Sequence, residues 1–407
     1  MVGEPVAVTG LGLLTPAGCD VGTNWTNLCA GRSLAARNPQ FAGLEVDISC
    51  DVRDFDPVVE LGGRLTRRLD RFAHLGIAAA RRAVVDADLQ VADGSPERVG
   101  VVLGVGSNSL RTYVAEFTRL AEDRSAAVSP LALPRSVPSM VAGEIALDIG
   151  AQGPNFTLSS ACASGSNALG VARSLLLGGM CDVVLAGGSE SWSRMTAACF
   201  SQMRALSART DRPELASRPF DRDRDGFVLG EGAAVLVLER LGHARARGAR
   251  SRALLCGYGS SADAHHVTAP HPEGAGAEQA VRQALADAGC TPGDIGHVNA
   301  HGTSTRLGDA AEARMLRRVF RDRMPPVTAT KGVIGHALGA AGAIEAAVTV
   351  LALERQEVPP VANISRQDPG CELDIVTGSP RRVDFRRALS TSFAFGGQNA
   401  ALVFGAA

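Results

Sequence analysis

Hydrophobic positions along the chain fall into two alternating patterns. Short runs rich in valine, leucine and alanine, bounded by glycine or polar residues, predict buried strands. The predicted strands are Val6–Leu14, Arg98–Leu103, Val183–Ala186, Ala233–Glu239, Ala253–Gly259, His297–Asn299 and Ala400–Phe404. Longer alanine-rich runs predict helices at Arg67–Asp86, Cys162–Leu177, Ala277–Ala288, Asp309–Phe320 and Ala340–Leu353. Strands that alternate with helices in this way predict an α/β fold, with buried sheets covered by helices.

Two of the predicted helices begin in a similar way. In each, a polar turn leads into a helix of unusually small residues, first at Ser159–Gly165 and later at His336–Gly342. Because no bulky side chain holds other elements away, such a helix has close neighbours on every side. We therefore expect both helices to be central and buried. The repetition also predicts two similar halves, residues 1–250 and 251–407.

The composition narrows the class of protein. Of 407 residues, 45% are hydrophobic and 20% charged, as in an ordinary globular protein. The 41 basic and 42 acidic residues give a net charge of −1, which argues against general nucleic-acid binding. No apolar run approaches the roughly 18 residues of a membrane span, and the start lacks the basic segment of a secretory signal. Nine scattered cysteines predict free thiols in a reducing compartment, so we expect a cytoplasmic protein that binds neither membrane nor nucleic acid.

Cys162 is the strongest candidate for a catalytic nucleophile. It follows the strand-like stretch Asn155–Leu158 and stands at the predicted start of the helix Cys162–Leu177. The dipole of a helix stabilises a thiolate at its N-terminus, which makes the thiol more nucleophilic. The backbone N–H of Cys162 would be one of the unpaired donors there, available to a developing oxyanion. The alternative is a buried structural cysteine without a chemical role.

Two histidines and the only lysine lie on glycine-rich turns elsewhere in the chain. His301 directly follows a predicted strand, and His336 opens the second small-residue helix, five residues after Lys331. A helix N-terminus lowers the pKa of a histidine, so its imidazole stays neutral and donates one hydrogen bond. Each histidine alone is better explained as a buried side chain with satisfied hydrogen bonds, and the alternative for Lys331 is an ordinary surface lysine. Together with Cys162, they indicate one reactive site.

Several short motifs, taken in order, carry a resemblance to a known family. They are Val8–Gly12, Ser160–Gly170, Arg204–Ser207, Arg218–Asp221 with Asp225–Val228, His301–Thr305, Lys331–His336 and Phe393–Gly397. With these motifs, essentially the whole chain resembles a β-ketoacyl-[acyl-carrier-protein] synthase of the type II elongating class. The resemblance implies a dimer and a thiolase-like five-layer αβαβα fold. Its two similar halves would carry the nucleophilic Cys162 in residues 1–250 and both catalytic histidines in residues 251–407.

The same resemblance implies an acyltransferase that forms a C–C bond by decarboxylative Claisen condensation. Cys162 would take an acyl group from the phosphopantetheine thiol of an acyl carrier protein, so no bound cofactor is expected. Malonyl on the carrier then loses CO₂, and its carbanion attacks the acyl-cysteine, which lengthens the chain by two carbons. His301 and His336 can donate two N–H groups to the enolate oxygen.

Further roles are implied by position within the family motifs. The backbone N–H groups of Cys162 and Phe395 would form a second oxyanion hole, with Phe395 also acting as a gate. Lys331 would form an ion pair with Glu312 and so brace the histidines. The family often has glycine before the gating phenylalanine, whereas this chain has Ala394, which predicts a stiffer gate because alanine restricts the backbone.

Other positions match residues that bind the carrier and its cargo. Those implied to contact the pantetheine arm are Thr268, Thr303 and Thr305. Those implied to dock the acidic carrier protein are Arg64, Arg67, Arg68 and Arg204. Ser109 stands nearest to a position where a bulky aliphatic commonly lines the acyl pocket, which predicts a more open or more polar pocket. Such a pocket suits polyketide or unsaturated intermediates better than ordinary saturated acyl chains. His265, His266 and His271 match no strong metal signature, so we expect no metal.

Two other classes of protein stay open. A CoA-using enzyme of the thiolase type needs a second cysteine near the C-terminus, where Phe395–Gly397 offers none, and a CoA-primed initiating synthase has asparagine at the position of His336. A non-elongating partner subunit of the chain-length-factor type usually lacks the nucleophile. The sequence leaves open whether the chain pairs with a second copy or with such a subunit, and whether the pathway makes fatty acids or polyketides.

Overall fold

The computed structural model describes residues 5–107 and 110–407, in which ten strands form one mixed sheet. The strand order is β10-β9-β13-β14-β8-β1-β7-β6-β4-β5. The bounds of these strands are β1 Val6–Leu14, β4 Val99–Gly104, β5 Asn155–Leu158, β6 Val183–Glu190, β7 Gly232–Arg240, β8 Ala253–Ala262, β9 His297–Asn299, β10 Val327–Thr328, β13 Arg387–Ala394 and β14 Gln398–Gly405. Strands β1 and β8 pair antiparallel where the two halves of the sheet meet.

Counted outward from this centre, both halves follow the same series of strand directions. In the first half, β1–β7 and β7–β6 are antiparallel, and β6–β4 and β4–β5 are parallel. In the second half, β8–β14 and β14–β13 are antiparallel, and β13–β9 and β9–β10 are parallel. The predicted pair of similar α/β halves is therefore confirmed, while the boundary at residue 250 stays a prediction.

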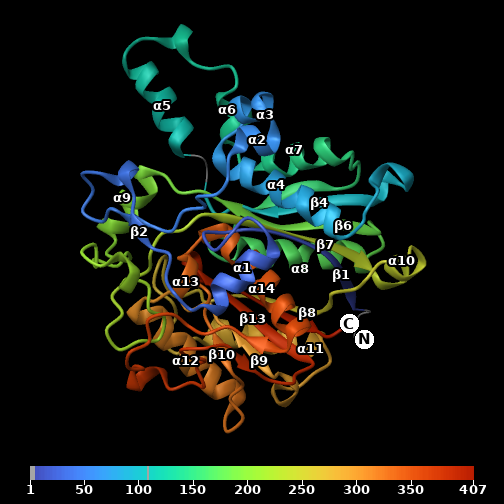
Figure 1. The fold of residues 1–407 in the computed structure, drawn as a ribbon, viewed down its shortest axis with the longest axis vertical. Coiled ribbons are helices and arrows are strands. Elements are labelled where there is room, and N and C mark those ends of the chain that lie inside the picture. The colour runs from blue at the N-terminus through green and yellow to red at the C-terminus, as the bar shows by residue number, and fades with distance from the viewer. Residues whose placement is uncertain (1–4, 108–109) are drawn as a thin grey trace.

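Two buried helices, α8 (Ser164–Leu177) and α14 (Ala341–Arg355), lie between the halves of the sheet (Figure 1). They share one hydrophobic core with β1, β6 and β7. Their small residues are required by the packing, since a Cβ on Gly165 would lie 2.7 Å from the backbone nitrogen of Ala343. Both helices are central and buried, as the sequence predicted.

Outer helices cover the two remaining faces. α4 (Arg71–Asp86) and α7 (Ser139–Ile149) pack on the first half of the sheet, and α11 (Ala275–Asp287) and α12 (Arg306–Phe320) pack on the second. Helix, sheet, helix, sheet and helix thus form the five layers of the thiolase-like fold. In the described part of the chain, no helix combines the length and the apolar character that crossing a membrane requires.

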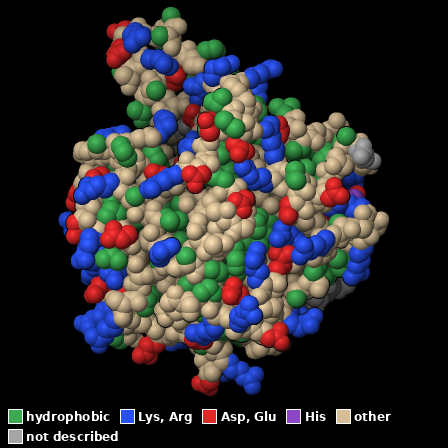
Figure 2. Space-filling model, viewed as in Figure 1, with side chains coloured by type: hydrophobic (Ala, Val, Ile, Leu, Met, Phe, Trp, Pro, Cys, Tyr) green, Lys and Arg blue, Asp and Glu red, His purple; other side chains and the backbone are tan. Residues whose placement is uncertain are grey.

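Shorter elements complete the fold. The remaining helices are α1 Val21–Cys29, α2 Pro57–Leu61, α3 Gly63–Arg68, α5 Leu110–Ala121, α6 Ala132–Ser136, α9 Arg194–Gln202, α10 Leu241–Ala246 and α13 Lys331–Ile334. Two small two-stranded sheets pair β2 Ala36–Arg37 with β3 Ile48–Ser49, and β11 Glu357–Val358 with β12 Arg381–Arg382. Helix α5 stands away from the body at the top of Figure 1. Figure 2 shows acidic and basic side chains interspersed over the face in view, in keeping with the balanced charge.

Most of the predicted helix boundaries are shifted by one to three residues, as at the start of α12, predicted at Asp309 and found at Arg306, and two differences change the picture of the fold. The single helix predicted over Arg67–Asp86 is interrupted, because Leu69 is extended (φ −121°, ψ 162°) and buries its side chain between α3 and α4. The helix predicted from Cys162 begins at Ser164, so Cys162 lies in the turn before it.

The turns that lead into α8 and α14 have the same unusual backbone. Ala161 has φ 48° and Leu338 has φ 43°, and each lies three residues before the first residue of its helix. A positive φ is unfavourable for a residue with a Cβ and persists only where the surroundings hold it. The two halves of the molecule therefore repeat a strained turn as well as a set of strands.

Candidate active site

Cys162 stands at the tip of the turn between β5 and α8, where it is half-buried. The turn is held by Ser164, whose hydroxyl accepts from the backbone N–H of Ser160 (2.9 Å) and donates to the carbonyl of Ala161 (2.6 Å). The positive φ of Ala161 turns the chain sharply just before the thiol. A short, tied turn of this kind places a nucleophile in a fixed direction.

The thiol of Cys162 does not ionise easily in the resting site, so the predicted stabilisation of its thiolate is wrong. Burial raises the pKa of Cys162 to about 12, and the positive charge of Lys331 and the backbone N–H of Phe395 offset only part of that rise. The carboxylates of Glu190 and Glu345 raise it further. At neutral pH the sulfur therefore holds its proton until a base accepts it.

The two histidines lie beside each other and are neutral. The ring centroids of His301 and His336 are 5.4 Å apart, with the rings nearly perpendicular at 87°. Burial and the nearby ammonium of Lys331 hold the pKa of both rings well below the usual value. Neutral rings were predicted from a helix dipole, and the causes that the structure shows are burial and the charge of Lys331. Each neutral ring offers one N–H donor and one lone pair.

Lys331 forms its ion pair with Glu345 of α14, so the predicted pair with Glu312 is wrong. Its ammonium also donates to the carbonyl oxygen of His301 over 2.7 Å and lies 3.3 Å from His301 Nδ1. Glu345 was missed by sequence reasoning. The available signal was a glutamate inside a helix of small apolar residues, since a buried carboxylate requires a partner and the chain has one lysine.

Glu312 braces His301 by another route. Its two oxygens accept from the backbone N–H groups of His301 and Gly302, each at 2.8 Å, and from the hydroxyl of Thr391 at 2.8 Å. Because these donors occupy the carboxylate of Glu312, the ammonium of Lys331 pairs with Glu345 instead. Lys331 and Glu312 thus fix the same histidine from opposite sides, through its carbonyl and its amide.

A single cavity of about 340 Å³ brings most of the predicted residues together. Its lining includes Cys162, His301, His336, Glu312, Phe395, Thr268, Thr303, Thr305 and Arg204. The hydroxyl oxygens of Thr303 and Thr305 lie 2.9 Å apart on its wall. The cavity therefore joins a thiol, two imidazoles and a row of hydroxyls that lie far apart in the sequence.

The segment after β13 forms one side of this cavity. Phe395 directs its backbone N–H at the sulfur of Cys162, and its ring centroid lies 5.9 Å from that of Phe200 in α9. The next residue, Gly396, has φ 77° and donates its N–H to the carbonyl of Val267 (2.7 Å). The turn after β13 is therefore tied to the loop that carries Thr268.

The histidines of that loop have a local role. Nδ1 of His266 accepts from the backbone N–H groups of Thr268 (3.1 Å) and Ala269 (3.0 Å). The rings of His265 and His271 meet edge to face, with centroids 5.1 Å apart. These contacts shape the loop that presents Thr268 to the cavity.

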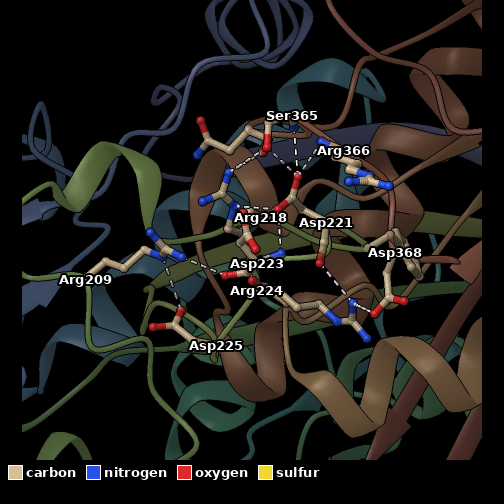
Figure 3. Close-up of polar contacts among 12 residues, drawn as sticks. Arg209, Arg218, Asp221, Asp223, Arg224, Asp225, Ser365, Arg366 and Asp368 are labelled. Atoms are coloured by element: carbon tan, nitrogen blue, oxygen red, sulfur yellow. Dashed lines mark hydrogen bonds and ion pairs between the residues drawn. The ribbon is translucent and has the colours of Figure 1, made fainter. Parts of the chain in front are cut away.

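A network of charged side chains centred on Asp221 and Arg224 (Figure 3) adjoins the wall that carries Thr303 and Thr305. The guanidinium of Arg224 donates to the carbonyl of Thr305 (3.1 Å) and pairs with Asp368 (2.6 Å). Asp309, which lies 3.5 Å from Arg224, accepts from the backbone N–H of Ser304 (3.0 Å). Burial raises the pKa of Asp309 to about 7. Arg224, which lies between the motif segments Arg218–Asp221 and Asp225–Val228, therefore helps to hold the cavity wall in place.

The arginines predicted to dock the carrier lie on α3 and beside the cavity. Arg64 and Arg67 are exposed on α3, whereas Arg68 of the same helix forms an ion pair with Glu144 of α7. Arg204 is exposed after α9. Ser109, predicted for the acyl pocket, lies outside the described residues.

Comparisons with known proteins follow the same division into halves. The chain matches the family models "Beta-ketoacyl synthase, N-terminal domain" over residues 3–244 and "Beta-ketoacyl synthase, C-terminal domain" over residues 252–365. It is 40% identical over 404 residues to the "3-oxoacyl-[acyl-carrier-protein] synthase 2" of Staphylococcus aureus (strain N315), covering 98% of this chain and 97% of that relative.

Two solved structures extend the likeness to three dimensions. The ishigamide ketosynthase/chain length factor matches with a TM-score of 0.93 and 34% identity, and a type II PKS acyl-carrier protein in complex with its ketosynthase bound to the hexaketide matches with 0.92 and 29%. In both, all of this chain and all of the matched chain are covered. The chain therefore belongs to the beta-ketoacyl synthase family.

Proposed function

We propose that the protein condenses a cysteine-bound acyl chain with malonyl-[acyl-carrier protein], with Cys162 as nucleophile and His301 and His336 as the decarboxylating pair. The observation that carries this proposal is the single cavity that holds all three side chains, with the hydroxyls of Thr303 and Thr305 on its wall. Those hydroxyls suit the amide groups of a pantetheine arm. The curated relative of the same family is a 3-oxoacyl-[acyl-carrier-protein] synthase 2.

The first step is acyl transfer. The sulfur of Cys162 attacks the thioester carbonyl of the acyl carrier, a new C–S bond forms, and the bond to the pantetheine sulfur breaks. Because burial raises the pKa of Cys162 to about 12, the proton has to leave during the attack. A neutral imidazole of the pair accepts it and returns it to the departing pantetheine thiol, so the step is balanced.

The second step is condensation. The C–C bond to the malonyl carboxylate breaks, CO₂ leaves, and the electron pair forms an enolate whose oxygen accepts from His301 and His336. The enolate carbon attacks the carbonyl of the acyl-cysteine, and the backbone N–H groups of Cys162 and Phe395 stabilise the resulting oxyanion. The C–S bond to Cys162 then breaks, the thiolate takes up a proton from solvent through the histidine pair, and the product leaves on the carrier two carbons longer.

The carrier protein supplies the phosphopantetheine, and the enzyme holds no cofactor or metal of its own. Exposed arginines on α3 and beside the cavity, Arg64, Arg67 and Arg204, support docking of an acidic partner in the cytoplasm. Arg68 contributes less, because Glu144 neutralises it. Polyketide intermediates are the proposed cargo, supported by the similar fold of a ketosynthase solved with a hexaketide.

A second subunit is proposed to cover α5. This helix carries exposed Val114, Phe117 and Leu120, and Phe117 is 64% exposed. Apolar side chains of this size gather on a surface where another protein covers them. The partner is either a second copy or a chain-length-factor-like subunit, since the similar ishigamide protein is a ketosynthase/chain length factor. The mass of the purified protein in solution, alone and with a co-expressed partner, distinguishes the two.

The proposed function is tested by intact-mass measurement after incubation with acyl-carrier donors. Wild-type protein is expected to gain the mass of the acyl group, and Cys162→Ala is expected to gain none. A wild-type protein that stays unmodified, or a variant modified as fast as wild type, contradicts the proposal. Offering saturated acyl and poly-β-ketoacyl donors side by side then decides between the fatty-acid and polyketide pathways.

A further inference from the structure

A buried carboxylate outside the predicted set contacts two segments at the edge of the active site. Glu190, the last residue of β6, is 2% exposed. One oxygen accepts from the backbone N–H groups of Gly106 (2.8 Å), Ser107 (3.2 Å) and Gly339 (3.2 Å). The other oxygen accepts from the hydroxyl of Ser107 (2.8 Å). Four donors converge on this side chain, and no lysine or arginine pairs with it in the described part of the chain.

The two segments joined by Glu190 are in direct backbone contact. Gly106 follows β4, and Gly339 lies in the turn before α14. A Cβ on Gly339 would lie 2.0 Å from the backbone nitrogen of Gly106, and a Cβ on Gly106 would lie 2.8 Å from that of Gly339. Two backbone amides this close repel each other's partial charge unless an acceptor lies between them, which is the place of the Glu190 carboxylate.

The turn held in this way carries His336. The backbone of His336 is fixed on one side, where its N–H donates to Val228 (2.8 Å) and its carbonyl accepts from Gly230 (2.9 Å). Two residues later, Leu338 has φ 43° and lines the cavity. Glu190 accepts a hydrogen bond from the next backbone N–H, that of Gly339. It therefore helps to hold the unfavourable positive φ of Leu338 from the C-terminal side.

We infer that Glu190 is a positioning residue for His336: its hydrogen bonds to Gly106, Ser107 and Gly339 hold the turn in the conformation that aims the imidazole into the cavity. The inference rests on the proposed function. Decarboxylation requires both imidazoles on one oxygen, whereas either ring can accept the proton in acyl transfer. Loss of Glu190 should therefore impair decarboxylation more than acyl transfer.

The test compares Glu190→Ala with Glu190→Gln in the full-length protein. Malonyl-carrier decarboxylation is followed by mass spectrometry of the carrier, and acyl transfer by the intact mass of the enzyme. Glu190→Ala is expected to slow decarboxylation by about 10²-fold, the usual cost of a catalytic group displaced by about 1 Å, and acyl transfer by much less. Glu190→Gln is expected to restore the wild-type ratio, because its carbonyl accepts the three amides and its NH₂ donates to Ser107.

A second readout does not depend on activity. Hydrogen exchange of the amides between residues 336 and 342 is expected to be faster in Glu190→Ala than in wild type. The matched control is Glu239→Gln. Glu239 is another buried carboxylate, lies on β7, binds Thr9 and Arg247, and does not line the cavity. The control variant should change neither this exchange nor the ratio of the two half-reactions.

Three results would overturn the inference: equal slowing of both half-reactions in Glu190→Ala, unchanged exchange over residues 336–342, or a Gln variant as selectively impaired as Ala. If Glu190→Ala does not fold, Glu190→Asp replaces it, because the shorter carboxylate cannot reach Gly106 and Gly339 together. A wild-type ratio in Glu190→Asp overturns the inference equally. Wild-type protein that neither takes up acyl groups nor decarboxylates malonyl carrier refutes the proposed function instead.

Discussion

The ammonium nitrogen of Lys331 lies 2.7 Å from the carbonyl oxygen of His301 and 3.3 Å from its Nδ1. The only lysine of the chain therefore touches the backbone and the ring of the same histidine, while its charge is balanced by Glu345. This placement keeps a positive charge beside both imidazoles and helps to hold them neutral. A neutral pair can both accept a proton and donate a hydrogen bond.

Replacing Lys331 by methionine should leave Glu345 buried without its partner. Breaking a buried ion pair by removing one member costs about 3–5 kcal/mol of folding free energy, so Lys331→Met should unfold at a markedly lower denaturant concentration. The double variant Lys331→Met with Glu345→Gln should recover part of that loss, because no unpaired charge remains. A single variant as stable as wild type in urea unfolding would contradict the pairing of Lys331 with Glu345.

The reactivity of Cys162 towards a thiol reagent should rise steeply with pH. Because burial raises the pKa of Cys162 to about 12, the thiolate fraction increases about tenfold per pH unit over the whole range from 7 to 10. Peptide-resolved alkylation by iodoacetamide measures this rate at Cys162 alone. A plateau below pH 8 would show a thiol that ionises far more easily than the structure indicates.

Glu190 should make stability depend on pH in a defined direction. Burial raises the pKa of Glu190 to about 7, above the 4.5 of an exposed glutamate, so the native state holds the proton more tightly than the unfolded state between these values. Stability contributed in this way is present at low pH and is lost as pH rises towards 7, by up to about 1.4 kcal/mol per pH unit.

Glu190→Gln removes this contribution and leaves every histidine unchanged. The difference in free energy of unfolding between Glu190→Gln and wild type should therefore shift in favour of the variant from pH 5 to pH 7 and level off above. Urea unfolding at pH 5, 6, 7 and 8 measures it. A difference that is the same at all four pH values would contradict the raised pKa.

Charge reversal at the docking arginines should weaken binding of the carrier without changing the chemical step. Arg67→Glu combined with Arg204→Glu should raise KM for carrier-bound substrate at low salt, and the effect should shrink as salt screens the charges. Arg382→Glu, on the exposed edge strand β12, is the matched control for loss of surface charge. Equal changes of KM in the control and in the double variant would contradict the proposed docking surface.

The sequence predicts the fold better than the details of the site. Val6–Leu14 forms a strand with the predicted bounds, because a long and mostly apolar run is typical of a buried strand. His297–Asn299 also has the predicted bounds, although only Val298 of its three residues is apolar. Strand β13 (Arg387–Ala394) was not predicted, since its interior contains Ser390, Thr391 and Ser392. The polar pattern makes sense only with its partners, such as the hydroxyl of Thr391 on Glu312.

The same limit explains the mistaken partner of Lys331. Motif spacing brings Lys331, His301 and Glu312 to one site, and the structure places all three there. Whether Glu312 or Glu345 pairs with the ammonium depends on which of them already accepts hydrogen bonds from backbone amides. Such hydrogen bonds join residues far apart in the sequence, so the spacing of the motifs does not reveal them. Glu345 takes the ammonium because His301 and Gly302 take Glu312.

The twin turns at Ala161 and Leu338 differ in their next residue, which is a cysteine in the first turn and a glycine in the second. A side chain at Gly339 is sterically excluded, because its Cβ would clash with the backbone of Gly106. The strained turn thus occurs twice, but only the first has room for a side chain at this position. In the second turn the close approach to Gly106 takes the space that the cysteine side chain fills in the first, and the turn joins His336 to α14.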